Sequence, residues 1–178
     1  MMKVLFLIAI FFSVFTTQEN TVLPEQISWR RHFLAAPDEH SSYFASTSTQ
    51  WHYSYSATIR GNDLHIDFKF SAGVDPNTSW VKLNRLRGAE SKRKLLNHEQ
   101  GHVNINFLLL KDGEQKVRFQ HYTVRNYKKA IQENANKVSA YYNAMQTRYD
   151  KETKHGSDDA NQARWDQLID EQLRRFIK

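Results

Sequence analysis

An apolar stretch with helical spacing, starting near Glu90, constrains the fold more than any other feature of this sequence. Its apolar residues and two histidines fall on neighbouring stripes, which comprise Leu95, His98, His102, Ile105 and Leu109, and Leu96, Val103, Phe107 and Leu110. The polar residues form only a narrow strip, made of Asn97, Gln100 and Asn104. A helix with so little polar surface is covered by other elements on most sides. We therefore predict a largely buried helix whose histidines face a crowded interior or a cleft.

Glycine and capping residues indicate where the helices of the second half begin and end. Asp112-Gly113 is predicted to close the buried helix, since glycine is common just after a helix C-terminus. A long amphipathic helix is predicted next, with core-facing residues that comprise Tyr127, Ile131, Asn134, Val138, Tyr141, Met145 and Tyr149. Ser157 or Asp158 can cap a last helix. The inward residues of that helix are Trp165, Leu168, Ile169, Leu173 and Phe176.

Residues 41–80 have a strand pattern instead. Side chains of alternating character in residues 51–59 and 64–70 flank the turn signal Gly61-Asn62-Asp63, which predicts a hairpin. Its core face carries Leu64, Ile66, Phe68 and Phe70. We therefore predict an α+β fold. In this fold a small antiparallel sheet from the N-terminal half packs on the buried helix, and two further helices complete the wall of a cleft.

The first 17 residues have the pattern of a secretory signal. Lys3 provides the positive charge, and residues 4–15 form an unbroken apolar segment. The alternative is an uncleaved N-terminal anchor, which is disfavoured because the segment is short for an ordinary membrane span. Residues 18–178 are long enough for one domain with a real core. We expect a secreted or periplasmic protein with no stable membrane insertion after signal cleavage.

Composition restricts both the chemistry and the partners. The chain has no cysteine, so it uses no disulfide or thiol chemistry, and any metal site must be built from histidines and carboxylates. The formal net charge is +6, but the basic residues are spread along the chain without the interleaved aromatic residues of a nucleic-acid surface. We therefore expect no nucleic-acid partner, and we predict a monomer.

The run His98-Glu99-Gln100-Gly101-His102 carries the chemistry. Two histidines four residues apart project side by side from successive helical turns, so one zinc ion (Zn²⁺) can bridge their imidazoles. Glu99 lies on the flank of the same face, where it can accept a proton from a zinc-bound water. The alternative is a pair of buried histidines bonded to the backbone or to carboxylates.

Gly101 interrupts this helix at a cost of about 1 kcal/mol relative to alanine. One explanation is a close approach by substrate or by another backbone. The other is tight packing against a neighbouring strand. Either explanation makes Gly101 a contact point of the buried helix.

A third protein ligand must come from elsewhere in the chain. The downstream candidates are His121, Glu133, Glu152 and His155. His155 is favoured because it lies in a dense polar cluster at a predicted helix end. Asp150 could hold a ligand imidazole in the right tautomer from behind, and Tyr149 could donate to the oxyanion that forms on attack.

Several segments together resemble a bacterial family of predicted secreted zinc-dependent proteases, which is catalogued as a domain of unknown function. The segments are Ile27-Ser28-Trp29 with Phe33, residues 45–48, Tyr53-Ser54-Tyr55, Ser79-Trp80-Val81, residues 95–102, residues 149–156, Gln162 and Trp165-Asp166. The resemblance implies a zincin-like metal site in an exported protein, with His98, His102 and His155 as ligands and Glu99 beside them. Val103 and Asn104 depart from the family, which has an aromatic residue and then an acid after the second histidine.

The sequence thus predicts a secreted zinc-dependent metallopeptidase that hydrolyses peptide bonds in a peptide or protein substrate. Zinc would activate the attacking water, Glu99 would be the general base and Tyr149 would steady the oxyanion. The first alternative is a non-catalytic exported zinc-binding or adhesion module with a structural metal. The second is a metal-free helical interaction protein with buried histidines.

Overall fold

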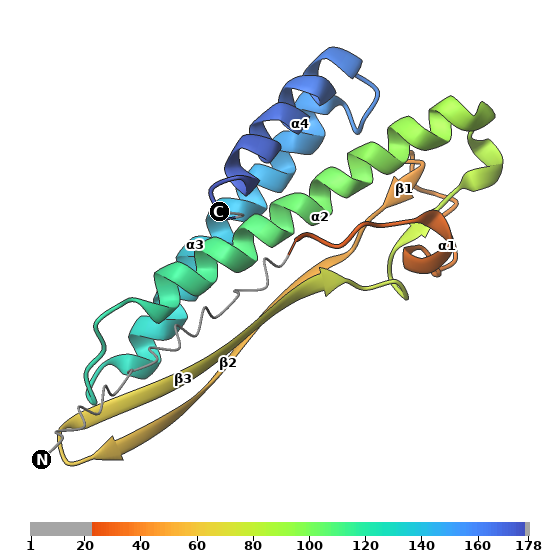
Figure 1. The fold of residues 1–178 in the computed structure, drawn as a ribbon. Helices are drawn as coiled ribbons and strands as arrows, with labels where there is room; N and C mark the ends of the chain where they lie inside the picture. Colours follow the sequence, from red (N-terminus) through yellow and green to blue (C-terminus); the bar gives the residue numbers. More distant parts are fainter. Residues whose placement is uncertain (1–22, 177–178) are drawn as a thin grey trace, which may run out of the picture.

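The computed structural model describes residues 23–176, so the predicted signal segment lies outside the described part of the chain. Its elements are α1 (Trp29–His32), β1 (Ala45–Ser46), β2 (Thr49–Arg60), β3 (Asp63–Val74), β4 (Trp80–Val81), the 3-10 turn η1 (Leu83–Arg85), α2 (Gly88–Arg118), α3 (Tyr127–Thr153) and α4 (Asp159–Leu173). Strands precede the long helices, which confirms the predicted α+β class (Figure 1). Among residues 23–176, no helix is long and apolar enough to span a membrane.

The predicted hairpin forms a long two-stranded ribbon from β2 and β3. Antiparallel pairing is continuous along all 12 residues of each strand. Gly61 in the turn has a φ of 61°, a left-handed conformation that glycine adopts without a Cβ clash. The inward Phe68 packs against Val117, Ile131 and Ala135 of α2 and α3. The ribbon therefore lies along the helices, as Figure 1 shows.

A second, very short sheet covers the N-terminal half of α2. β1 pairs antiparallel with β4, and β2 pairs with β3, so the strands form two separate sheets where one small sheet was predicted. Ala45 and Val81 of the short sheet are buried against Val103 of α2. The connection between the sheets is fixed because Ser48 N–H donates to the Ser79 hydroxyl at 2.9 Å. This arrangement holds residues 42–49 beside α2.

The helix α2 does not end at Asp112-Gly113, as predicted, but continues to Arg118. A Cβ added to Gly113 would lie 2.9 Å from Cζ2 of Trp51, so this glycine allows the hairpin to approach α2 closely. A glycine within a helix and a glycine after one look alike in sequence. Here the contact with Trp51 accounts for a glycine inside the helix.

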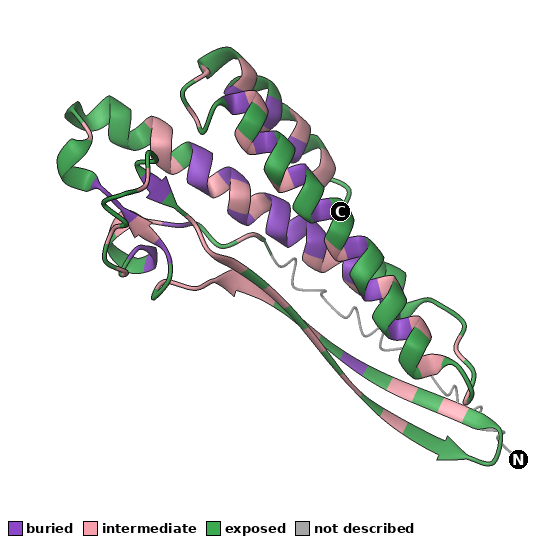
Figure 2. Cartoon of the chain, turned by 180° about the vertical axis from the view of Figure 1, so that it is seen from behind, coloured by how far each residue is buried: buried purple, intermediate pink, exposed green. Residues whose placement is uncertain are grey.

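The main core lies where α2, α3 and α4 face one another, and Figure 2 shows the buried residues concentrated on these sides. Its most deeply buried members comprise Ile105, Leu108, Tyr149, Trp165 and Ile169. After α3, Lys154, His155 and Gly156 all adopt positive φ values of 50°, 53° and 77°. This turn redirects the chain into α4, where the Asp158 side chain accepts from Asn161 N–H as the predicted cap.

Candidate metal centre

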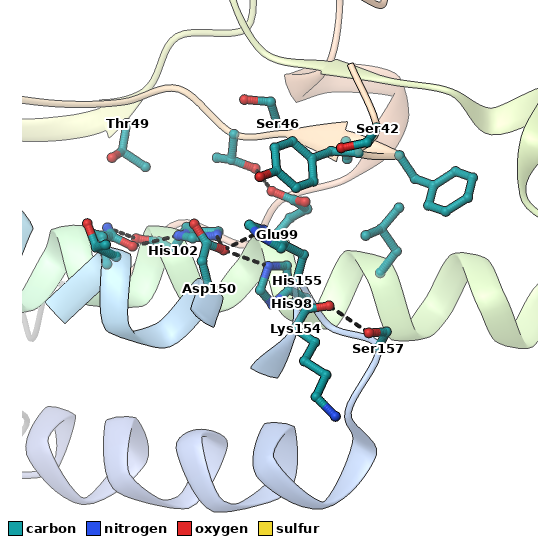
Figure 3. A pocket seen from close by; sticks show the side chains of 17 residues that line it. Ser42, Ser46, Thr49, His98, Glu99, His102, Asp150, Lys154, His155 and Ser157 are labelled. Carbon is teal, nitrogen blue, oxygen red and sulfur yellow. Dashed lines mark hydrogen bonds and ion pairs between the residues drawn. The ribbon is translucent and has the colours of Figure 1, made fainter. Parts of the chain in front are cut away.

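A cavity of about 510 Å³ lies beside the predicted motif. Residues 42–47 and Thr49 line one wall, while α2, the end of α3 and the turn after it line the others. Its lining includes His98, Glu99, His102, Asp150 and His155, as Figure 3 shows. The fold therefore brings two residues from the end of α3 and its turn to the motif helix, more than 45 positions away along the chain.

Three imidazoles converge on one carboxylate oxygen. Asp150 Oδ1 lies 3.2 Å from His98 Nε2, 3.0 Å from His102 Nε2 and 3.3 Å from His155 Nδ1. His98 is 2% exposed, so these groups meet at the edge of the core. Nitrogen and carboxylate lone pairs that face each other at such distances repel unless a proton or another cation lies among them.

The convergence suits a metal ion. Ligand atoms of His98, Asp150 and His155 all lie within 4.8 Å of one another, close enough to hold one ion. His102 is not in that group, although its Nε2 reaches the same Asp150 oxygen. The donors are imidazole nitrogens and a carboxylate oxygen, which is a common set for transition metals. The cluster could therefore hold a metal ion.

Charge interactions in the cluster shift two pKa values. Burial raises the pKa of the Asp150 carboxyl, but hydrogen bonds from His102 and His98 outweigh it and hold the pKa well below its usual range. Burial lowers the pKa of His102, but the hydrogen bond to Asp150 and the charge of Glu99 outweigh it, so the pKa is raised. Both shifts have the same source, the contact between the Asp150 carboxylate and the imidazoles, which favours an ionised Asp150 beside a protonated His102.

Glu99 is held in place by a hydroxyl from the opposite wall. It is only 3% exposed, and its Oε2 accepts a hydrogen bond of 2.5 Å from the Thr47 hydroxyl. Thr47 lies between β1 and β2, so the short sheet sets the orientation of the carboxylate. One buried carboxylate thus lines the same cavity as the imidazole cluster.

Tyr149 is close to the motif but is not among the residues that line the cavity, so its predicted role as an oxyanion donor stays a prediction without support from the cavity. Its side chain is fully buried, and its hydroxyl donates to the His98 carbonyl oxygen at 2.9 Å. Its ring stacks on the His98 imidazole at a centroid distance of 4.7 Å. Burial raises the pKa of the phenol above its usual range, so it stays neutral. Tyr149 therefore supports α2 at His98.

Tyr149 also explains Gly101, because a Cβ there would lie 2.2 Å from the Tyr149 hydroxyl oxygen. The close neighbour is therefore a side chain of α3, and neither a strand nor a backbone as predicted. Alanine in a helix normally stabilises by about 1 kcal/mol over glycine. Gly101→Ala is expected to destabilise instead, by about 1–3 kcal/mol, because the core is overpacked. Thermal and denaturant unfolding of the purified protein measure this.

Gly73→Ala is the matched control for this change, because an added Cβ there has no neighbour within 4 Å. The control is expected to unfold close to the wild type. A Gly101→Ala protein more stable than wild type would contradict the packing of Tyr149 against this glycine.

The other candidates for a third ligand point elsewhere. Glu152 accepts from Trp165 Nε1 at 2.9 Å and from Arg164 at 2.8 Å. His121 and Glu133 are exposed and are not among the residues that line the cavity. Of the downstream candidates, the structure brings only His155 to the cluster within the described part of the chain.

A family model described as a bacterial protein of unknown function (DUF922) matches residues 16–156, most of the chain. The chain belongs to the DUF922 family. No curated protein and no solved structure matches it.

The DUF922 match begins before the described residues and ends at Gly156, so it includes every member of the imidazole cluster and Glu99. Gly156 itself packs against the site, since a Cβ there would lie 2.7 Å from the His98 Cβ. The two residues of the His-Gly pair thus have different structural roles in this turn. His155 reaches the cluster, and Gly156 leaves room for His98.

Three side chains at the DUF922 site were not predicted for it. Gln146 contacts His102 Nδ1 at 2.6 Å, Gln162 contacts His98 Nδ1 at 3.1 Å, and Thr47 contacts Glu99. Asp150 was expected behind an imidazole, but it lies on the side where the three nitrogens converge. Gln146 and Gln162 instead contact the Nδ1 atoms, on the side of each ring away from Asp150. Gln162 had a signal in the family resemblance, whereas Gln146 had none.

Proposed function

We propose that this protein is an exported zinc-dependent peptidase whose metal is held by His98, His102 and His155. The observation that carries the proposal is the buried Glu99 carboxylate, which lines the same cavity as the three imidazoles. A metal that only braced a fold would have no use for a buried carboxylate beside an open cavity. This pairing is what hydrolysis by a metal-activated water requires.

The donor set supports zinc among the possible metals. Imidazole nitrogens are favoured zinc ligands, and three protein ligands leave a fourth position for water or substrate. A bound zinc ion lowers the pKa of coordinated water towards neutrality and polarises a carbonyl group. The chain has no cysteine, so thiolate-dependent alternatives such as iron–sulfur clusters do not apply.

The residues of the cavity supply proton transfer and contacts to the substrate. Glu99, oriented by Thr47, accepts the proton of the attacking water and delivers it to the leaving amine. Residues 42–47 supply the opposite wall, which combines the hydroxyl residues Ser42, Ser46 and Thr47 with Tyr43, Phe44 and Ala45. The Tyr149 hydroxyl is bonded to the His98 carbonyl, so the polarisation of the substrate carbonyl would be supplied by a metal held by the three histidines.

The short strand β1 supports a peptide as the substrate. Lys82 N–H donates to the Phe44 carbonyl oxygen at 2.7 Å, so Phe44 occupies a hydrogen-bonded position opposite β4. In an antiparallel ladder the next residue points its N–H and C=O to the other side. The N–H and C=O of Ala45 therefore point away from β4, and Ala45 lines the cavity. An extended peptide can add to such an edge by main-chain hydrogen bonds.

A second cavity supports an extended substrate as well. It has a volume of about 200 Å³ and shares Thr49 and Gln146 with the first. Its other lining residues come from β2, α2 and α3, and none of its lining residues is charged. The two cavities together would accommodate several residues of a peptide chain.

The proposed export is supported by the signal pattern of residues 1–17.

Metal removal tests this proposal. Protein purified without chelator is expected to contain about one zinc per chain and to cleave peptides of a mixed library. Dialysis against a strong chelator is expected to abolish cleavage, and added zinc is expected to restore it. Elemental analysis and mass spectrometry of the peptide products provide the two measurements. Protein that folds without zinc and takes up none would contradict the proposal.

Asp150 favours the second candidate function, a non-catalytic zinc-binding module. Its Oδ1 lies within 3.3 Å of all three imidazole nitrogens, so it could serve as a fourth protein ligand. Four protein ligands make a closed structural site. Stoichiometric zinc with no hydrolysis of any library peptide would favour this candidate.

A further inference from the structure

Each motif histidine has a glutamine behind it. Gln146, on α3, lies against His102, and Gln162, on α4, lies against His98. In both pairs the contact is to Nδ1, the nitrogen that faces away from Asp150 and the other imidazoles. The rear nitrogen of a ligand histidine decides which tautomer the ring adopts.

The orientation of the Gln146 amide follows from its second contact. Its Nε2 donates to the His102 carbonyl oxygen at 2.9 Å, which can only accept. Its Oε1 must therefore face His102 Nδ1, 2.6 Å away. An amide oxygen has no hydrogen to give, so Nδ1 carries the proton. In the neutral ring that binds a metal ion, the lone pair of His102 is then on Nε2, which points to the cluster.

The Gln162 amide is oriented in the same way by different partners. Its Nε2 donates to Asp166 Oδ1 at 2.7 Å and to the Tyr149 hydroxyl oxygen at 2.7 Å. That hydroxyl gives its own hydrogen to the His98 carbonyl, so it accepts from Gln162. The Gln162 Oε1 therefore faces His98 Nδ1 at 3.1 Å. Nδ1 must donate, so in the neutral ring the lone pair of His98 is again on Nε2.

A further acceptor lies near His98. The Thr153 hydroxyl oxygen is 3.4 Å from His98 Nδ1, and it donates its hydrogen to the Tyr149 carbonyl at 2.7 Å. Only its lone pairs remain for the imidazole. The surroundings of Nδ1 thus accept and do not donate.

We infer that Gln146 and Gln162 are positioning residues that lock both motif histidines in the Nδ1-protonated tautomer and so present two Nε2 lone pairs to the metal. This inference rests on the proposed zinc site. Without these acceptors, each neutral ring would populate both tautomers, and metal binding would have to select one tautomer and fix the orientation of the ring. Loss of such partners of ligand histidines typically weakens metal affinity by about 10–100-fold.

Methionine is the variant of choice because it keeps the length of glutamine and removes both hydrogen-bonding groups. Gln146→Met and Gln162→Met are each expected to weaken zinc binding by about 10–100-fold. Gln146→Glu keeps an acceptor for Nδ1 and is expected to bind zinc more tightly than Gln146→Met. Competition with a chromophoric chelator, well below the unfolding temperature, gives the dissociation constants.

Gln100→Met is the matched control. Gln100 lies within the motif, and its amide is also held by hydrogen bonds, since it accepts from Ile27 N–H and donates to the Glu25 carbonyl and to Asn104, but its amide bonds neither histidine. Its loss is expected to lower stability and leave the zinc dissociation constant unchanged. Wild-type protein that binds no zinc would refute the proposed function. Wild-type binding with equal affinity in Gln146→Met and Gln162→Met, or an equal loss in Gln100→Met, would refute the positioning role alone.

Discussion

Glu99→Gln is expected to lower the rate of peptide hydrolysis by about 10²–10⁴-fold while one zinc ion stays bound, because a general base typically contributes that factor. Glutamine keeps the shape of the side chain and an oxygen that can accept from Thr47, whose hydroxyl now bonds Glu99 Oε2 at 2.5 Å. It cannot accept the proton of the attacking water. Initial rates on the best library peptide, with zinc content measured on the same sample, test this expectation.

Glu90→Gln provides a control in the first turn of the same helix, where Glu90 is exposed and bonded to Arg93. It is expected to leave both activity and zinc content unchanged. A Glu99→Gln protein that retains the wild-type rate would show that another group takes the proton. Loss of zinc together with activity would mean that Glu99 acts on the metal site itself.

His98→Ala and His102→Ala are each expected to weaken zinc binding by on the order of 10²–10³-fold. Structural zinc sites bind with about 10–16 kcal/mol in total, so one ligand among three or four accounts for several kcal/mol. The Nε2 atoms of the two histidines lie 3.2 and 3.0 Å from the same Asp150 oxygen. Each histidine would therefore supply its own ligand atom, and the loss of one leaves one ligand fewer. Dialysed protein is expected to contain well below one zinc per chain.

His52→Ala is the control for these variants, because His52 is exposed on the hairpin, where it bonds Gln50. Its zinc content is expected to match the wild type. His155→Ala is expected to behave like the motif variants, since its Nδ1 lies in the same cluster. Full zinc binding by His155→Ala would assign the third ligand position to Asp150, and full binding by His102→Ala would overturn the site.

The sequence predicted those parts of the fold that depend on local spacing. Residues four apart on a helix share a face, so His98 and His102 are neighbours in any fold that keeps α2 helical. Alternation of side chains along β2 and β3 likewise depends only on strand geometry, and the turn at Gly61 is set by its own φ. These features need no information from distant residues.

Two glycines of α2 have roles that the neighbouring sequence does not predict. The sequence predicts that Gly113 ends a helix and that Gly101 meets a strand, a backbone or substrate, yet each glycine accommodates an aromatic side chain from another element. The neighbours are Trp51 of β2 and Tyr149 of α3. The sequence shows that a helix lacks a side chain at a glycine, but it does not show which distant residue packs against that position.

By itself, then, the sequence determined the α+β class and a histidine pair with a carboxylate on one buried helix, because these follow from the periods of helices and strands. Only the tertiary structure decided what completes the site. The contacts of His98 with Gln162, His102 with Gln146 and Glu99 with Thr47 join residues 64, 44 and 52 positions apart. Such contacts depend on how α3, α4 and the short sheet pack on α2. They also gave Tyr149 and Asp150 places that their positions along the chain did not reveal.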